Sequence, residues 1–223
     1  MHMFSTEKHF YGGHGIVGAQ VPIGAGLALS NKYKGNGNVS LAFFGDGASN
    51  QGQVYEAFNM AKLWSLPVIF VIENNQYAMG TSVIRSSAET ELHKRGSSFE
   101  IKGIQVDGMN VLEVRDAAKK AIKHARDGKG PMILEMKTYR YRGHSMSDPA
   151  KYRTRDEVTK TRSERDPIDM VKNRLIEEGW ATDDTLKSID KEIKLIVAEA
   201  AEFAQTSPEP DASELYTDVL LDA

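Results

Sequence analysis

The feature that most constrains the fold of this chain is a continuous apolar run, Pro67-Val-Ile-Phe-Val-Ile72. The run lacks the alternation of a strand with one solvated face, and strands of parallel sheets, which helices cover on both faces, have this composition. Other apolar runs alternate with segments of helical spacing. In chain order these strands and helices are predicted at 39–44, 51–65, 67–72, 104–106, 111–126 and 132–136. The order β-α-β-β-α-β predicts an α/β fold with a mostly parallel sheet flanked by helices.

The distribution of charge divides the chain into two parts. Only three of the 33 residues in 15–47 are charged, against 24 of the 55 residues in 151–205. The first stretch is typical of a buried region and the second of a solvated helical surface. We therefore predict an α/β domain over residues 1–141, a polar loop over 142–165, and C-terminal helices over 166–223 that pack on the same domain.

Capping residues predict where several helices begin and end. Asn110 and Glu113 fit a capping box, while Asp166-Pro167 begins a C-terminal helix that Gly179 ends. A further helix from Thr182 carries one apolar stripe formed by Leu186, Ile189, Ile193, Val197 and Ala200. Its polar face carries charges of both signs, which favours packing on the sheet domain over binding to a membrane surface.

Composition and charge exclude several classes of function. The net charge of −3 provides no global attraction for nucleic acid or an anionic membrane. No apolar run reaches the roughly 18 residues of a transmembrane helix, and the first residues lack the apolar region of a secretory signal. The chain has no cysteine, which excludes disulfides, thiolate zinc sites and cysteine nucleophiles.

Residues 13–18 match the Gly-x-Gly-x-x-Gly pattern of dinucleotide-binding loops. Such a loop must directly follow a buried strand, and residues 7–12 are not one, so a nicotinamide site is not predicted. The helix expected over 17–34 contains many small residues, which lower helix propensity. We expect this helix to approach another helix closely in a subunit interface, and the alternative is packing inside the chain.

Two polar motifs each end an apolar strand. Gly45-Asp46-Gly47 and Asn74-Asn75 are separated by the 26 residues 48–73, enough for one helix and one strand. Ligands of open α/β sheets lie beyond the carboxyl ends of the strands, so both motifs are expected at one edge. The helix that begins near Ser49 would favour a diphosphate, and Mg²⁺ would take carboxylate, amide, carbonyl and phosphate oxygens. For Asp46 alone, a helix cap is the alternative.

These motifs and their surroundings resemble a known family. The strand-end pair is similar to the thiamine diphosphate-binding motif. Four segments resemble the α subunit of the pyruvate dehydrogenase E1 component, a thiamine diphosphate-dependent 2-oxo acid dehydrogenase: FYGGHGIVGAQVP (10–22), GDGASNQG (45–52), ENNQYAMGTS (73–82) and YRYRGHSMSDP (139–149). The resemblance runs from residue 1 to about residue 221. The family's chain has a further N-terminal part, so we expect Met1 to match an internal methionine in a fragment or split gene product.

The resemblance implies a site for thiamine diphosphate and Mg²⁺. The positions that match the family's metal ligands are Asp46, Asn75 and the carbonyl of Tyr77. The positions that match its cofactor contacts are Gly47 and Ala48 at the diphosphate, Gly15 and Val17 near the pyrimidine, and His144. Ala78 stands where the family often has glycine, and no loss of function is expected from that difference.

His144 and Ser145 lie in the last of the four segments. A loop histidine flanked by Arg140, Arg142 and Asp148 has the chemistry of an acid or an electrostatic stabiliser near neutral pH. The resemblance implies that His144 is catalytic, in reductive acetylation of the lipoyl group. Ser145 matches a serine that is phosphorylated in the mitochondrial enzymes and is a candidate regulatory residue.

The resemblance also implies partners. It indicates an α subunit that oxidatively decarboxylates pyruvate with an E1 β subunit, in an α2β2 heterotetramer, and that meets the lipoyl domain of the E2 acetyltransferase. Neither Glu56 nor Glu73 is a convincing acid for activating the pyrimidine, and the family places that glutamate on the β subunit. The alternatives are a branched-chain 2-oxo acid or acetoin dehydrogenase, or a non-catalytic fragment that retains only the assembly surface. No nucleic acid or membrane partner is expected, and the compartment would be cytoplasmic in a bacterium or the mitochondrial matrix in a eukaryote.

Overall fold

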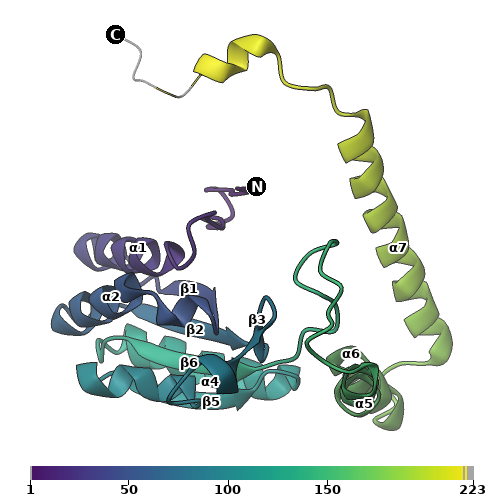
Figure 1. Cartoon of the computed structure of the whole chain (residues 1–223), viewed down its shortest axis with the longest axis horizontal. Coiled ribbons are helices and arrows are strands. Elements are labelled where there is room, and N and C mark those ends of the chain that lie inside the picture. The colour runs from purple at the N-terminus through teal and green to yellow at the C-terminus, as the bar shows by residue number, and fades with distance from the viewer. Residues whose placement is uncertain (1, 218, 220–223) are drawn as a thin grey trace. The chain divides into compact units, whose positions relative to one another are not determined.

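The computed structural model describes residues 2–217 and 219, and Figure 1 shows its elements. The described residues form two compact units, of which the first ends at Met170 and the second begins at Val171. The helices are α1 (Gln20–Lys34), α2 (Gly52–Leu63), α3 (Val83–Ser86), α4 (Val111–Arg126), α5 (Arg155–Arg165), α6 (Pro167–Glu177), α7 (Asp183–Thr206) and the 3-10 helices η1 (Ala48–Asn50), η2 (Leu92–Phe99) and η3 (Ala212–Tyr216). The strands are β1 (Ser40–Gly45), β2 (Val68–Asn74), β3 (Tyr77–Ala78), β4 (Thr81–Ser82), β5 (Lys102–Asp107) and β6 (Met132–Lys137).

A four-stranded sheet in the order β1-β2-β6-β5 forms the centre of the first unit, and every neighbouring pair is parallel. β2 and β6 lie inside the sheet, and the apolar residues 68–72 of β2 are all buried. An interior strand of a parallel sheet is covered by helices on both faces, which is the physical reason for the unbroken apolar run of β2. The predicted α/β fold with a mostly parallel sheet is therefore confirmed, and the only antiparallel pair among the described strands is the short β3–β4 hairpin.

Helices cover both faces of the sheet (Figure 1). On one face, α1 and α2 pack on β1 and β2 through a buried cluster that includes Phe44, Phe58 and Phe70. On the other face, α4 packs through Ala121 against a cluster that includes Leu134. Burial of one large apolar side chain contributes about 1.5–3 kcal/mol, so these two clusters fix the sheet that carries the strand-end motifs.

The small residues of α1 have an explanation inside the chain. Its buried residues are Val21, Gly24, Ala25 and Ala28. A Cβ atom at Gly24 would lie 2.7 Å from the Cβ atom of Ala42 on β1, so a larger residue would push the helix off the sheet. The alternative of internal packing therefore holds for this face, and an interface formed by the rest of α1 stays a prediction.

The helix starts predicted at Asn110 and at Asp166-Pro167 are confirmed. The capping box is not, because Glu113 Oε1 accepts from Nδ2 of Asn110 at 3.0 Å and not from its amide, which donates to the Asp107 carbonyl. The helices α3, α5, η2 and η3 are not in the predicted set. The side chain of Asn110 accepts hydrogen bonds from the amides of Leu112 (3.1 Å) and Glu113 (3.4 Å) at the start of α4. The prediction of a loop over 142–165 is wrong for its last part, because 155–165 form α5. The sequence of α5 contains a single apolar residue, so no stripe marks it. Its signal is the Thr154 cap, whose hydroxyl accepts from the Glu157 amide at 3.1 Å.

The second unit contains most of α6, together with α7 and η3. No described residue of α6 or α7 is buried, and the predicted stripe of α7 is exposed at Ile189, Ile193 and Val197. Packing of these helices on the sheet domain stays a prediction. Among the described residues, no helix combines the length and apolar character needed to cross a bilayer.

Candidate functional site

The two strand-end motifs meet at the carboxyl edge of the sheet. β1 and β2 are neighbours, and their register pairs Gly45 with Glu73. A Cβ atom at Gly47 would lie 2.5 Å from the Cβ atom of Ala78. The loop after β1 therefore lies directly against the turn after β2, and glycine at 47 makes this approach sterically possible.

Asp46 is a buried carboxylate at this edge, with 4% of its surface exposed. Burial raises the pKa of Asp46 above its ordinary value, and the smaller effects of its own backbone, Arg140 and the Asn75 amide only partly oppose it. Within residues 2–217 and 219, no basic side chain forms an ion pair with Asp46. Asp46 does not cap α2 either, because the N-cap position is Gln51. A buried carboxylate without a cationic partner is costly and suits a site that receives a cation.

The turn after β2, which contacts the loop that contains Asp46, carries further oxygen atoms. The Asn75 side-chain oxygen accepts a hydrogen bond from the Tyr77 amide at 3.2 Å. Gln76 adopts a left-handed conformation with φ of 77°, which reverses the chain tightly. The Tyr77 carbonyl accepts from Nη1 of Arg140 at 3.1 Å. The structure thus places the three predicted metal-ligand residues on two touching loops.

This donor set differs from the usual clusters of ionisable ligands. In the described part of the chain, no group of three or more His, Cys, Asp or Glu side chains is arranged to hold a metal ion. Asp46 would supply the only ionised ligand, with an amide and a backbone carbonyl beside it. Such a neutral oxygen set suits Mg²⁺, which usually takes one or two protein carboxylates and completes its shell with phosphate and water.

A 3-10 turn, η1, follows Asp46 and contains the predicted diphosphate contact Ala48. The Ser49 hydroxyl donates to the Asp46 carbonyl at 2.5 Å. Arg95 from η2 then donates through Nη1 to the Ser49 carbonyl at 2.7 Å and to its hydroxyl at 2.9 Å. The helix predicted to start near Ser49 is thus preceded by a separate turn, and Arg95, which sequence reasoning missed, anchors that turn.

The loop that carries His144 and Ser145 connects to the same edge through hydrogen bonds. Arg140 donates to the Tyr77 carbonyl and, through Nη2, to the Tyr152 hydroxyl at 2.9 Å. The Tyr152 hydroxyl donates to Asp148 at 2.8 Å, and Asp148 also accepts from the His144 amide at 2.7 Å. These bonds lower the pKa of Asp148 to about 2, with the His144 amide as the largest cause.

The side chains of His144 and Ser145 themselves are exposed. Ser145 Oγ lies 3.0 Å from Ser147 Oγ, so its contact is with the same loop. Hydrogen bonds to the Asp148 carboxylate fix the backbone of this loop, whereas the predicted catalytic side chain of His144 and the predicted regulatory side chain of Ser145 are exposed to solvent. The position of His144 suits contact with a molecule arriving from solvent.

Glu157 of α5 forms a second link to the edge. Its Oε1 accepts from the hydroxyls of Tyr77 at 3.1 Å and Tyr139 at 2.7 Å. Burial and then the neighbouring Glu157 raise the pKa of Tyr139 to about 12, so both phenols remain neutral donors. α5 thereby holds the ring of the residue whose carbonyl is a predicted metal ligand.

Gly15 and Val17 lie in the exposed segment before α1. The Val17 carbonyl accepts from Gln53 Nε2 at 2.9 Å, and Gln53 belongs to the first turn of α2. A Cβ atom at Gly18 would touch the side chains of Gln51 and Gln53. The segment is thus joined to the helix that follows the Asp46 loop, and contact with a pyrimidine stays a prediction.

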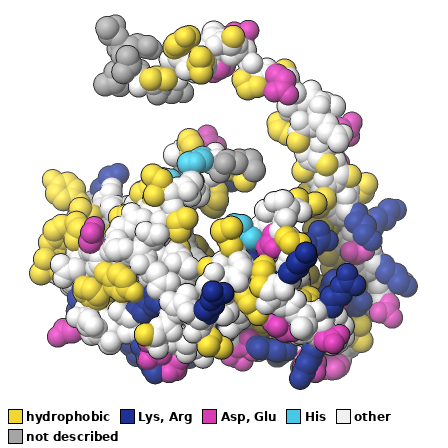
Figure 2. Space-filling model, in the orientation of Figure 1, with side chains coloured by type: hydrophobic (Ala, Val, Ile, Leu, Met, Phe, Trp, Pro, Cys, Tyr) yellow, Lys and Arg dark blue, Asp and Glu magenta, His cyan; other side chains and the backbone are white. Residues whose placement is uncertain are grey.

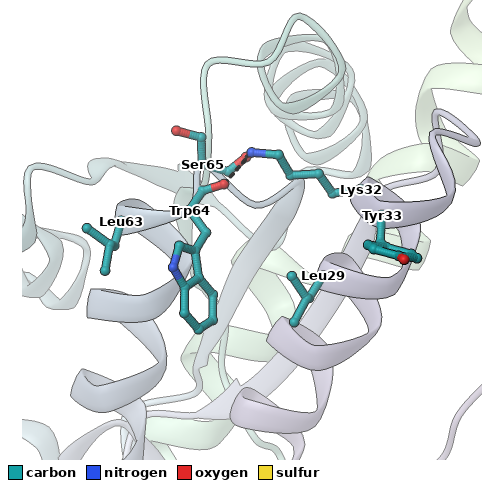
Figure 3. Close-up of a pocket in the computed structure, with 6 residues that line it drawn as sticks. All are labelled: Leu29, Lys32, Tyr33, Leu63, Trp64 and Ser65. Carbon is teal, nitrogen blue, oxygen red and sulfur yellow. Dashed lines mark hydrogen bonds between the residues drawn. The ribbon is translucent and has the colours of Figure 1, made fainter.

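An open hollow of 480 Å³ lies at another place in the same unit (Figure 3). It is lined by Leu29, Lys32, Tyr33, Leu63, Trp64 and Ser65, from the carboxyl ends of α1 and α2. The chain runs from these helix ends into the amino ends of β1 and β2, so the hollow lies opposite the candidate site. Figure 2 shows hydrophobic side chains gathered over α1 and α2, where Leu63 and Tyr33 are exposed.

Comparison with known proteins gives a consistent family. The profile of the dehydrogenase E1 component family matches residues 1–213. The chain is 70% identical over 221 residues to "Pyruvate dehydrogenase E1 component subunit alpha" of Rhizobium meliloti (strain 1021), covering 99% of this chain and 64% of that protein. Identity to the protein of the same name from Zymomonas mobilis is 59%, over 99% of this chain and 62% of the relative.

A mitochondrial relative is also similar. The testis-specific mitochondrial form from Rattus norvegicus is 55% identical, over 96% of this chain and 54% of its own length. The chain thus spans less than two thirds of the length of these relatives. With a profile match over nearly its whole length and buried oxygen donors at the matching strand ends, this chain belongs to the dehydrogenase E1 component family.

Proposed function

We propose that this chain binds Mg²⁺ and thiamine diphosphate at the carboxyl edge of its sheet and works as the α subunit of a pyruvate dehydrogenase E1 component. The observation that carries the proposal is the contact between two oxygen-bearing loops, one of which contains Asp46, a buried carboxylate with no ion-pair partner among the described residues. The names of the relatives from Rhizobium, Zymomonas and rat support the pyruvate type over the branched-chain and acetoin types.

The residues at this edge fit the two groups. Asp46, the Asn75 amide oxygen and the Tyr77 carbonyl would hold Mg²⁺, and a Cβ atom at Gly47 would close the gap between their loops. Gly47 and Ala48 would contact the diphosphate through their backbone, because amides of a turn favour anions. Arg140 and Arg153 lie nearby, with the Arg153 guanidinium 5.8 Å from the centre of the Tyr77 ring.

When bound, thiamine diphosphate supplies an electron sink for the carbanion that remains after decarboxylation of a 2-oxo acid. The chain's own residues would orient that group and exclude water from it. Glu73 and Glu56 are both exposed, which agrees with an activating glutamate on a β subunit rather than here. His144 would donate or hold a proton at its imidazole when the lipoyl group of an E2 domain arrives at the exposed loop.

Ser145 is the proposed regulatory residue of the same loop. A phosphate there would add about −1.5 to −2 charge, two residues before Ser147 and three before Asp148. Because the Asp148 carboxylate already fixes the loop backbone, added negative charge would compete for its donors and repel the cofactor phosphates. We expect inactivation, and a weaker effect in the same direction from Ser145→Glu.

The test is co-expression with a β chain, followed by calorimetric titration with thiamine diphosphate at several Mg²⁺ concentrations. Pyruvate decarboxylation is then measured with an artificial electron acceptor. Metal-dependent binding together with pyruvate turnover supports the proposal. Assembly with the β chain but no binding of thiamine diphosphate would refute the site and support the alternative of a non-catalytic fragment that retains only the assembly surface.

The α2β2 assembly and the compartment are proposed with it. Sizing of the co-expressed pair measures the assembly, and a lone α chain under the same conditions is the control. Relatives occur in bacteria and as a mitochondrial form, so the cytoplasm or the mitochondrial matrix is proposed according to the source.

A further inference from the structure

Glu135 is a buried charge at a place where an apolar residue is expected. It lies in β6 within Met-Ile-Leu-Glu-Met-Lys, is fully buried and occupies an interior strand. An ionised carboxylate in such a place is strongly destabilising unless it is hydrogen-bonded and compensated. None of the proposed cofactor contacts involves Glu135, so a buried charge at this position of the sheet needs a separate physical reason.

The carboxylate of Glu135 collects donors from three neighbouring elements. Oε1 accepts from Asn74 Nδ2 of β2 at 2.7 Å. Oε2 accepts from the His93 amide of η2 at 3.1 Å and from Gln105 Nε2 of β5 at 3.3 Å, and it lies 2.8 Å from His93 Nδ1. Burial raises the pKa of Glu135, but the bonds from His93 and Asn74 together outweigh it and hold the pKa below its ordinary value.

An ionised carboxylate can only accept hydrogen bonds, and this determines which way the Asn74 amide faces. Its NH₂ group must point toward Glu135, so its oxygen must point the other way, into the turn. There Asn74 Oδ1 accepts from the Gln76 amide at 3.2 Å and from Gln76 Nε2 at 3.2 Å. Gln76 is the left-handed residue between Asn75 and Tyr77.

We propose that Glu135 is a positioning residue for the metal-binding turn: by fixing the orientation of the Asn74 amide, it holds the Gln76 conformation that presents Asn75 and the Tyr77 carbonyl toward Asp46. The inference rests on the proposed function, because these are its metal ligands. Glu135 itself would touch neither metal nor cofactor. Residues that orient metal ligands in this way typically change metal affinity by about 10- to 100-fold when they are replaced.

The decisive variants exchange donors and acceptors without changing shape. Glu135→Gln places an NH₂ group or a neutral oxygen opposite Asn74, so the Asn74 amide is no longer forced into one orientation. In the double variant Glu135→Gln/Asn74→Asp, the side-chain amide introduced at position 135 donates to the carboxylate introduced at position 74. The other oxygen of that carboxylate again accepts from the Gln76 amide. The double variant has the same net charge as the parent protein, because the negative charge removed at position 135 is replaced at position 74. Gln105→Leu is the matched control, since it removes a bond to Glu135 but leaves Asn74 unaffected.

Two readouts are measured on the full chain. Hydrogen exchange of the Gln76 amide is followed without ligand, and the Mg²⁺ concentration for half-maximal thiamine diphosphate binding is measured with the β chain present. We expect Glu135→Gln to lose Gln76 protection and to raise the Mg²⁺ requirement roughly 10- to 100-fold. The double variant should recover protection, and Gln105→Leu should match the parent protein in both readouts.

Unchanged Gln76 exchange in Glu135→Gln would overturn the inference, as would a loss that the double variant does not recover. If Glu135→Gln fails to fold, Asn74→Asp alone serves as the starting variant, because two facing carboxylates should free the turn and Glu135→Gln should then restore it. If the parent protein binds thiamine diphosphate without needing Mg²⁺, the proposed metal site fails, while the exchange data still decide the role of Glu135.

Discussion

The carboxyl edge of the sheet and the loop over 139–153 are stabilised by different kinds of contact. At the edge, Asp46, Asn74 and Glu135 are buried, and their positions follow from strand register and from steric contact between loops. In the loop, His144 and Met146 are exposed, and the backbone is fixed by hydrogen bonds to the side chain of Asp148. The edge is held by the core, whereas the loop depends on a few polar contacts.

This difference matches two separate roles in the proposed site, metal binding at the edge and contact with substrate in the loop. Groups that must hold a metal in fixed geometry gain from a rigid support, because misplaced ligands lose affinity. A loop that meets an incoming substrate gains from a low local unfolding free energy. Arg140 joins the two regions, since its guanidinium donates to the Tyr77 carbonyl of the edge and to Tyr152 of the loop.

The largest expected effect comes from removing the buried carboxylate of the edge. Asp46→Ala should lower the affinity for Mg²⁺ and thiamine diphosphate by orders of magnitude, because the only ionised ligand of the set is lost. The fold should remain, since Asp46 lies at a strand end and burial raises its pKa. Titration calorimetry with the β chain measures the affinity. Asp107→Ala, at the end of β5 and paired with Arg165 at 2.6 Å, is the control and should bind normally.

Steric contact at the edge gives the second prediction. Gly47→Ala would place a Cβ atom 2.5 Å from that of Ala78, although the backbone φ of −66° suits alanine. Overpacking of this kind costs about 1–3 kcal/mol, and cofactor affinity should fall with it. Chemical denaturation measures the stability. Ala78→Gly in the same chain should recover most of both losses, and a failure to recover would show that the two loops are not in contact.

A variant of the connecting arginine should separate the two regions. Arg140→Met removes the donors to Tyr77, Met79 and Tyr152, and charged hydrogen bonds contribute about 1.5–3 kcal/mol each when well formed. Hydrogen exchange should therefore accelerate across 140–153 while the amides of β2 remain protected. Arg142→Met is the control, because Arg142 takes part through its carbonyl. Equal acceleration in β2 and in the loop would contradict a separate loop.

The smallest effect concerns pH. The pKa of Asp148 is lowered from 3.8 to about 2 by the amides of His144 and Ala150, so the ionised carboxylate stabilises the loop above pH 4 and this contribution is lost as the pH falls through 2. Protection of the His144 and Ala150 amides, measured by NMR and corrected for intrinsic exchange, should be constant from pH 7 to 4 and decrease below it. A decrease between pH 7 and 5 would assign control of the loop to another group.

Much of the architecture could be predicted from the sequence because it depends on local patterns. The unbroken apolar run of β2 predicts a strand covered on both faces, and the Asn110 cap predicts the start of α4. The pairing of Gly45-Asp46-Gly47 with Asn74-Asn75 follows from the rule that parallel strands end at one edge. The helix α5 could not be predicted in this way, because it has no apolar stripe and only the Thr154 cap indicates where it begins.

By itself, the sequence determined the class of the sheet, the edge at which the two polar motifs meet and the family, since apolar periodicity and short motifs are contiguous in the chain. Only the tertiary structure decided which distant residues support that edge: Arg95, Glu135, Arg140 and Glu157. It also decided that Gly24 packs on Ala42 inside the chain. The physical reason is that these contacts depend on strand order and on the paths of loops. Glu135 meets Asn74 across 61 positions only because β6 lies beside β2.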